Sequence, residues 1–445
     1  ISKRSKDLGS PISITDAKKF VRPLSVEDSQ PSTVRDAYPW LADWVYVGPD
    51  EIFYDLRTKE TLTERAFNAK HNRLMLTVSD RQEGKAAPDV AASNLALNLA
   101  EIPVVSGVAH KPSDVVEDMF EFRGLQFANS WRDTGPAVVP EWEWDDAQAF
   151  AVECVKKQVE MCAPEKPEIF MSFLAHLVQF RGKKIRWAPL LVGVQGSGKS
   201  VWANIMAGVL GYGNSQSIPQ SVLASGFLRS LMAAELTVLE ELKARVHRYD
   251  IENALRDLIA NPWSTTTEKS LKPLTQPNHT NFIGTSNYAD ALPLESNDRR
   301  WYVESSVLRT QDDVAAFQER CPDHFDTLAR IEFSPHLSAA VRGFLMSYPI
   351  SQSFKDCAVS APMTVAKRRM IGVSEDPIAA IIRDIIDSNT GPLFNKTFVS
   401  LTILRKHLSL ENVDKAYLDP ADRKLSRVMR EALGMQPMEW RPERP

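Results

Sequence analysis

The stretch that decides the fold is LLVGVQGSGKS, residues 190–200. An apolar run, typical of a buried strand, stops there in a glycine-rich turn that ends in Lys-Ser. The turn matches G-x-x-x-x-G-K-[ST] at every fixed position, and the following VWANIMAGVL places apolar side chains at helical spacing. Backbone N–H groups of such a turn, together with a helix N-terminus, favour a bound anion. The sequence therefore predicts a nucleotide-binding loop rather than a plain structural turn.

Each residue type in this loop suits a triphosphate. We expect Lys199 to reach the β- and γ-phosphates and the Ser200 hydroxyl to hold Mg²⁺. The other positions supply backbone N–H groups that wrap around phosphate oxygens. The predicted ligands are therefore ATP and Mg²⁺. The predicted nucleotide-binding residues are Gly193, Val194, Gln195, Gly196, Ser197, Gly198, Lys199, Ser200 and Val201.

Composition limits the class of protein. The chain has 445 residues, 43% hydrophobic and 25% charged, which is typical of a globular protein of several domains. A continuous apolar run of about 18 residues is absent, so we expect no membrane partner. The net charge of −4 gives no global basic field, so any contact with nucleic acid has to be local. The four cysteines lack C-x-x-C pairing and nearby His clusters, which favours a reduced intracellular protein without zinc.

Two further predicted strands end in polar side chains that suit hydrolysis. ELTVLEEL, residues 235–242, reads as an apolar strand ending in Glu240 and Glu241. Because side chains alternate along a strand, we expect Glu240 on the Mg²⁺ side and Glu241 beside the attacking water. HTNFIGTSN, residues 279–287, ends in Asn287, which suits a hydrogen bond to the γ-phosphate or its water. The alternative for Asn287 is an ordinary turn residue.

NDRRW, residues 297–301, precedes another β-like run and contains two adjacent arginines. Arg299 and Arg300 have two interpretations. They form an exposed strand edge, with one guanidinium paired to a neighbouring acid, or one of them reaches the γ-phosphate bound by a neighbouring subunit. The residues alone leave both interpretations open.

The order GVQGSGKS, LTVLEE, FIGTSN and NDRRW, within residues 193–301, resembles a superfamily 3 helicase. More narrowly it is similar to the helicase part of phage and plasmid primase–helicases. The likeness extends upstream through FMSFLAHLVQFRGKK and NSWRD and downstream to APMTVAKRRM. It implies a compact AAA+-like core, a hexameric ring, and ATP bound between subunits. The resemblance makes Lys199 and Ser200 the Walker A pair, Glu240 and Glu241 the Walker B pair, Asn287 the sensor, and Arg299 or Arg300 the arginine finger.

The same resemblance implies a DNA-binding hairpin between the second and third motifs. Here that stretch is TTTEKSLKPLTQPNHTN, residues 265–281, with Lys269 and Lys272 near its tip. Lysines in such a loop neutralise phosphates without reading sequence. Taken alone, two lysines in a polar loop indicate only a solvated surface. No aromatic or histidine follows them at the tip, which argues against base stacking.

These elements predict an α/β fold with a P-loop AAA+-like core. Within the N-terminal region we expect a β-hairpin over residues 43–58 and an irregular linker over 80–115. Further along, we expect a helix over 147–162 capped by Asp145 or Asp146, and a second from Glu168 to Gly182. The predicted segments are a polar tail (1–30), an α+β accessory region (31–138), a helical collar (139–183), the ATPase core (184–310), a helical lid (311–375) and a winged-helix-like domain (376–445).

The predicted function is an ATP-driven DNA helicase or translocase of a phage or mobile-element replication protein. It would act in the cytoplasm of a host cell on single-stranded or forked DNA. The alternatives are an ATP-switched DNA-binding assembly module that does not unwind, and the helicase part of a longer primase–polymerase. Because the chain begins at Ile1 and shows no acid cluster for nucleotidyl transfer, we expect a fragment, with any primase or polymerase domain upstream.

Overall fold

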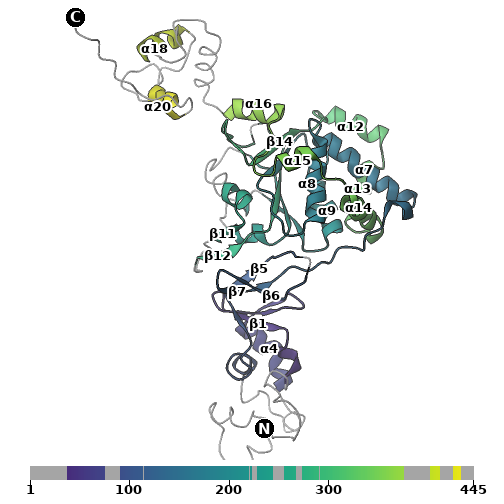
Figure 1. The fold of residues 1–445 in the computed structure, drawn as a ribbon, viewed down its shortest axis with the longest axis vertical. Helices are drawn as coiled ribbons and strands as arrows, with labels where there is room; N and C mark the ends of the chain where they lie inside the picture. Colours follow the sequence, from purple (N-terminus) through teal and green to yellow (C-terminus); the bar gives the residue numbers. More distant parts are fainter. Residues whose placement is uncertain are drawn as a thin grey trace, which may run out of the picture.

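The computed structural model describes residues 38–75, 91–113, 115–219, 221–222, 228–243, 255–266, 273–289, 291–374, 401–410 and 424–431. Its centre is a five-stranded sheet, in strand order β14-β8-β13-β10-β9, in which every neighbouring pair is parallel (Figure 1). The strands are β8 (Ala188–Val192), β9 (Ser215–Pro219), β10 (Leu236–Glu240), β13 (Asn281–Ser286) and β14 (Trp301–Ser305). Because all five run the same way, their carboxyl ends share one edge of the sheet.

Side chains of these strands alternate between two hydrophobic clusters. On one face Leu191 and Tyr302 pack against a helical layer that Figure 1 shows beside the sheet. On the other face Leu190 and Trp301 pack with residues 255–259 and with α16 (Val365–Ser374). Burial on both faces explains why the strands read as continuous apolar runs. The helical layer consists of α7 (Asp146–Cys162), α8 (Pro167–Gln179), α9 (Val201–Leu210), α13 (His324–Ile331) and α14 (Pro335–Ser347).

The helices before the sheet begin as expected, but the second ends early. Asp145 caps α7 by accepting the Gln148 N–H at 2.8 Å, while the Gln148 side chain accepts the Asp145 N–H at 3.1 Å. The second helix, α8, ends at Gln179 rather than at Gly182. Gly182 has φ 74°, and a Cβ there would lie 2.3 Å from the Pro112 oxygen. Glycine is needed there for close contact with the N-terminal region, not as a helix cap.

The N-terminal region contains two small sheets. In the first, strand order β3-β2-β1-β4, β1 and β2 form the predicted hairpin with Trp44 opposite Asp55. The irregular linker predicted over 80–115 is wrong for its described part, because Leu95, Ile102 and Val105 are buried there. Its apolar residues cover aromatic side chains of the first sheet. The elements are β1 (Trp44–Val47), β2 (Ile52–Asp55), β3 (Thr61–Thr63), α4 (Glu64–Met75), α6 (Ala92–Asn94), β4 (Val104–Val105), β5 (Gly107–Ala109), β6 (Met119–Phe122) and β7 (Leu125–Asn129).

A buried polar network joins the N-terminal region to the central sheet. The Trp131 indole donates to Glu235 at 2.7 Å, and the Arg181 Nε donates to the same carboxylate at 2.8 Å. Asp133 pairs with Arg342 of α14 at 2.9 Å. The NSWRD stretch therefore has a structural use here, fastening the accessory region to the start of β10.

The remaining described elements complete the chain. Between β10 and β13, two short strands form an antiparallel hairpin. Most of the winged-helix-like domain expected over 376–445, and the tail expected over 1–30, lie outside the described residues. In the part of the chain that the structure describes, no helix is long and apolar enough to cross a membrane. These elements are β11 (Trp263–Thr266), β12 (Leu274–Pro277), α12 (Gln311–Arg320), α15 (Gln352–Asp356), α18 (Leu401–Leu410) and α20 (Lys424–Glu431).

Candidate nucleotide site

The glycine-rich loop leaves the carboxyl end of β8 and leads directly into α9, as the sequence predicts. Gly196 and Gly198 have φ values of 83° and 78°, which place both in the left-handed region. A Cβ on Gly198 would lie 2.4 Å from the Gln158 side-chain nitrogen. The loop therefore lies tightly against α7, and a side chain at position 198 is excluded by both space and backbone conformation.

Lys199 lies inside this loop. Its side chain is buried, and Nζ donates to the Val194 oxygen at 2.7 Å and to the Ser197 hydroxyl at 3.4 Å. Burial lowers the pKa of Lys199, while Cys162 and Glu241 oppose that shift by favouring the charged form. The ammonium group is thus held where the loop curves and within electrostatic reach of Glu241.

Gln158 of α7 holds the loop from behind, a contact that sequence reasoning missed. This fully buried amide donates from Nε2 to the Ser197 and Gly198 oxygens, both at 3.1 Å. Its Oε1 then faces His324 Nε2 at 3.0 Å, so this ring nitrogen carries the hydrogen. Burial lowers the pKa of His324 to about 4, which keeps the ring neutral at pH 7. A chain of two buried side chains therefore fixes two carbonyls of the loop.

The two predicted acids end β10 in different conformations. Glu240 is the last residue of the strand and is half-buried, whereas Glu241 is exposed with φ 54°. A left-handed backbone at a glutamate costs about 1–3 kcal/mol, and such strain persists where surrounding contacts enforce it. Here the neighbouring strand does so: the Thr285 oxygen accepts the Leu242 N–H at 2.9 Å, and the Ser286 hydroxyl donates to the Leu242 oxygen at 2.6 Å.

Asn287 follows β13, which lies between β8 and β10 in the sheet. The Ser286 oxygen accepts the Gly193 N–H at 3.1 Å, so the end of β13 contacts the start of the glycine-rich loop directly. Asn287 itself is exposed. The structure therefore brings Lys199, Ser200, Glu240, Glu241 and Asn287 to one edge of the sheet.

Arg299 and Arg300 lie at the opposite edge. They precede β14, whose first residue Trp301 pairs with Ala188, the first residue of β8. The Arg300 oxygen accepts the Ala188 N–H at 2.8 Å. Six residue positions separate this level from Gly193, or about 20 Å at about 3.3 Å per residue. The arginine pair is therefore not part of its own chain's glycine-loop site, and it lines a separate pocket of about 310 Å³.

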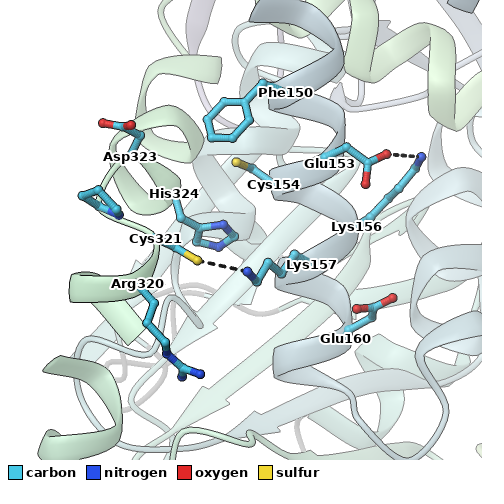
Figure 2. A pocket seen from close by; sticks show the side chains of 11 residues that line it. Phe150, Glu153, Cys154, Lys156, Lys157, Glu160, Arg320, Cys321, Asp323 and His324 are labelled. Atoms are coloured by element: carbon cyan, nitrogen blue, oxygen red, sulfur yellow. Dashed lines mark hydrogen bonds and ion pairs between the residues drawn. The ribbon is translucent and has the colours of Figure 1, made fainter. Parts of the chain in front are cut away.

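A cavity of about 590 Å³ lies between α7 and the turn from α12 to α13 (Figure 2). It contains none of the predicted site residues. Figure 2 shows Lys157 directed at Cys321, with Nζ 3.1 Å from Sγ, and Lys156 paired with Glu153 at 2.6 Å. Both lysines thus have partners within the wall of the cavity, and His324 of the cavity contacts Gln158, which is bonded to the loop.

The glycine loop and the end of β10 offer oxygen donors of the kind that Mg²⁺ binds together with a phosphate. No group of three or more His, Cys, Asp and Glu side chains that could hold a metal occurs among the described residues. Mg²⁺ commonly takes one or two protein oxygens and completes its shell with phosphate and water. Ser200 and Glu240 would supply those two oxygens. The predicted DNA-binding residues Lys269 and Lys272 lie outside the described residues, between β11 and β12.

Comparison with known proteins identifies a fold. Residues 191–300, from β8 to the arginine pair, match DUF5906, a family of unknown function. The chain is similar to the solved C-terminal region of NrS-1, with a TM-score of 0.55 at 17% identity over 88% of this chain and 87% of that one. A second structure of that region, in its A form, gives 0.52 at 18% identity over the same shares. A match to a JCV helicase reaches only 0.31 at 14% identity over 56% of this chain and 66% of that one. No curated protein matches. The chain therefore shares the fold of the NrS-1 C-terminal region.

Proposed function

We propose that this chain is an ATP-dependent DNA helicase or translocase with a superfamily 3, AAA+-like core that hydrolyses ATP between subunits of a hexameric ring. One observation carries the proposal. The parallel sheet gathers the glycine loop, two acids and a terminal asparagine at one edge, and presents two arginines at the other edge, about 20 Å away. A hydrolytic site divided in this way is completed when copies pack head to tail.

Each residue at the carboxyl edge then has a defined task. The loop amides and Lys199 bind the β- and γ-phosphates. Ser200 and Glu240 would hold Mg²⁺, which would neutralise charge on those phosphates. Glu241 accepts a hydrogen bond from the attacking water and takes its proton. Asn287 orients that water or the γ-phosphate. Lys199 leaves its bonds to Val194 and Ser197 when it turns to a phosphate, so the ligand replaces contacts that the loop now makes to itself.

The arginine pair supplies the part that this edge lacks. Charge develops on the transferred phosphoryl group, and a guanidinium from a neighbouring subunit accelerates that step by about 10³–10⁵-fold in related sites. Arg299 is exposed and Arg300 is half-buried, so both are available at a subunit surface. The surface-pair alternative, an arginine paired with Asp298 or Glu295, gains no support from the described residues. Asp298 bonds instead to backbone N–H groups and to Lys367, and Glu295 pairs with Arg256 at 3.4 Å.

The DNA part of the proposal rests on the resemblance of the motifs, with Lys269 and Lys272 as the residues that contact phosphates. A DNA-stimulated ATPase assay combined with strand displacement on forked DNA tests it. We expect turnover and displacement from the parent chain, and neither from Lys199→Ala. ATP turnover without displacement of either polarity would favour the assembly module instead. Absence of ATP binding by the parent would overturn the proposal.

A further inference from the structure

One buried lysine of α16 is bonded to the turn that carries the arginine pair. Lys367 has no exposed surface, and its Nζ donates to the Asp298 backbone oxygen at 2.7 Å. The same Nζ lies 3.1 Å from Asp298 Oδ1. This is an ion pair removed from water, which persists only where further hydrogen bonds support it.

Asp298 in turn sets the backbone of the arginine pair. Its Oδ1 accepts the Arg300 N–H at 3.1 Å and the Trp301 N–H at 3.0 Å. These bonds fix the chain at the point where it enters β14, and hence the direction in which Arg299 and Arg300 leave the backbone. The carboxylate therefore positions the arginines through hydrogen bonds to the main chain. Lys367 neutralises the negative charge of this carboxylate.

The segment before Lys367 is bonded both to the same turn and to β14. Ala361 N–H donates to the Arg299 oxygen at 2.8 Å, and the Thr364 hydroxyl donates to the Val303 oxygen at 2.5 Å. Thr364 also accepts the Lys367 N–H at 3.0 Å. Residues 361–367 are thus bonded to the turn and to β14, and Lys367 is the residue of this segment that forms the ion pair with Asp298.

The charges around the turn show why the neutralisation of Asp298 by Lys367 matters. Asp298, Arg299 and Arg300 line the same pocket. Within the part of the chain that the structure describes, Asp298 Oδ2 and Arg300 Nε are buried atoms without a hydrogen-bond partner. Without Lys367, Asp298 would be an unpaired buried carboxylate facing a pocket of guanidinium groups, and it would attract one of them.

We propose that Lys367 is a positioning residue for the arginine pair: by neutralising Asp298 it leaves both guanidinium groups free for the phosphate bound by a neighbouring subunit. This role rests on the shared site proposed above and adds to it a residue from α16. In this role, Oδ1 of Asp298 still holds the backbone of the turn, while Lys367 neutralises the negative charge of the carboxylate.

Steady-state ATPase of the full chain separates this role from general damage. Lys367→Met should lower kcat about 10- to 100-fold with the KM for ATP nearly unchanged, because the glycine loop is untouched. Lys367→Met with Asp298→Asn should recover most of the lost kcat, since the asparagine oxygen still accepts the two backbone N–H groups and no unpaired charge remains. The matched control is Arg369→Met, which removes an exposed charge from the same helix and should leave kcat at the parent value. A parent-like kcat for Lys367→Met, or a folded double variant without recovery, would overturn the role.

Mixing chains gives a second readout that a purely structural role would not move. Lys367→Met combined with Lys199→Ala should regain ATPase, because the first chain keeps an intact loop and the second keeps intact arginines. The reference mixture replaces Lys367→Met by the double variant Arg299→Ala/Arg300→Ala. Recovery in the reference mixture alone overturns only the role of Lys367. If neither mixture recovers, the shared site is wrong, and the role of Lys367 is rejected with it.

Discussion

The glycine loop (residues 193–200) and the turn that contains Arg299 and Arg300 (residues 298–300, the arginine turn) are both short cationic segments at the ends of neighbouring strands. They differ in how their polar groups are hydrogen-bonded. In the loop, Lys199 bonds to its own backbone, and two loop carbonyls bond to Gln158. In the turn, the backbone is equally well bonded, but Arg300 Nε has no partner among the described residues. Lys199 and these two carbonyls of the loop are therefore bonded within one chain. The backbone of the turn is bonded within the chain, whereas the phosphate that we propose for its arginines belongs to a neighbouring subunit.

Sheet geometry accounts for that difference. Strands β8 and β14 are parallel neighbours, but the loop follows one and the turn precedes the other. About 20 Å of sheet lies between them, which is more than an arginine side chain spans. The loop and the turn of one chain therefore cannot share one phosphate. We therefore expect that the glycine loop and the arginine turn can be altered independently of each other.

The largest expected effect comes from a substitution beside the glycine loop, which should largely abolish hydrolysis and leave the arginine turn unchanged. Glu241→Gln should bind ATP with parent affinity but lower kcat by about 10²–10⁴-fold, because the group that accepts the proton of the water is lost. Nucleotide titration and single-turnover hydrolysis on the same preparation measure the two quantities. Hydrolysis at the parent rate would remove Glu241 from its role.

The second effect concerns β14, the strand that carries the arginine turn. Burial raises the pKa of Glu304 to about 7, although the Tyr302 hydroxyl and two backbone N–H groups favour its charged form. An acid with a raised pKa stabilises the fold below its unfolded pKa and loses that contribution as pH rises through about 7. Between about pH 4.5 and 7, Glu304 should therefore remove about 3 kcal/mol from the free energy of unfolding. Denaturant titrations at several pH values should show a smaller decline for Glu304→Gln, and parallel curves would contradict the assignment.

The third effect loosens the loop without touching the turn. Gln158→Leu leaves the Ser197 and Gly198 oxygens without their donor, so the Kd for ATP should rise about tenfold, as expected for an unmade buried hydrogen bond. Gln179→Leu is the matched control, because Gln179 also donates to two carbonyls, those of Leu345 and Tyr348, away from the loop. Calorimetric titration with ATP should distinguish the two variants. Equal affinities would show that the loop holds its shape without α7.

The smallest effect measures the strain at the end of β10. Glu241→Ala and Glu241→Gly should both be inactive, but the glycine variant should be more stable by about 1 kcal/mol, because only glycine adopts φ 54° without penalty. At Glu240, inside the strand, the order should reverse, with the alanine variant the more stable one. Chemical denaturation of the four variants tests both signs. The same order at both positions would exclude strain at Glu241.

The sequence predicted local elements well where a motif had one physical solution. The glycine loop needs a strand before it and a helix after it, and β8 and α9 are both present. Glu240 lies in β10 and Asn287 directly follows β13, as predicted. Glu241 instead leaves the strand with φ 54°, so strand alternation does not set the direction of its side chain. The β1–β2 hairpin and the Asp145 cap were equally readable, because turn and capping chemistry are local.

What the sequence could not provide depends on contacts between distant segments. Gln158 reads as one polar residue in a helix, and only the packing of α7 against the loop makes it a ligand of two carbonyls. Lys367 lies within APMTVAKRRM, but its partner Asp298 lies 69 positions earlier in the sequence. The opposite placement of the loop and the turn requires the strand order, which no single motif contains.

If one hydrolytic site uses the loop of one subunit and an arginine of the next, as we claim, then mixing two inactive chains should restore ATPase. Lys199→Ala lacks a working loop, and Arg299→Ala/Arg300→Ala lacks the turn. In an equal mixture with random assembly, about a quarter of the head-to-tail interfaces regain both parts. We predict that ATPase recovers to about that fraction of the parent rate in verified mixed assemblies. No recovery in such assemblies, or full ATPase of the double-arginine variant as a monomer, would contradict the claim.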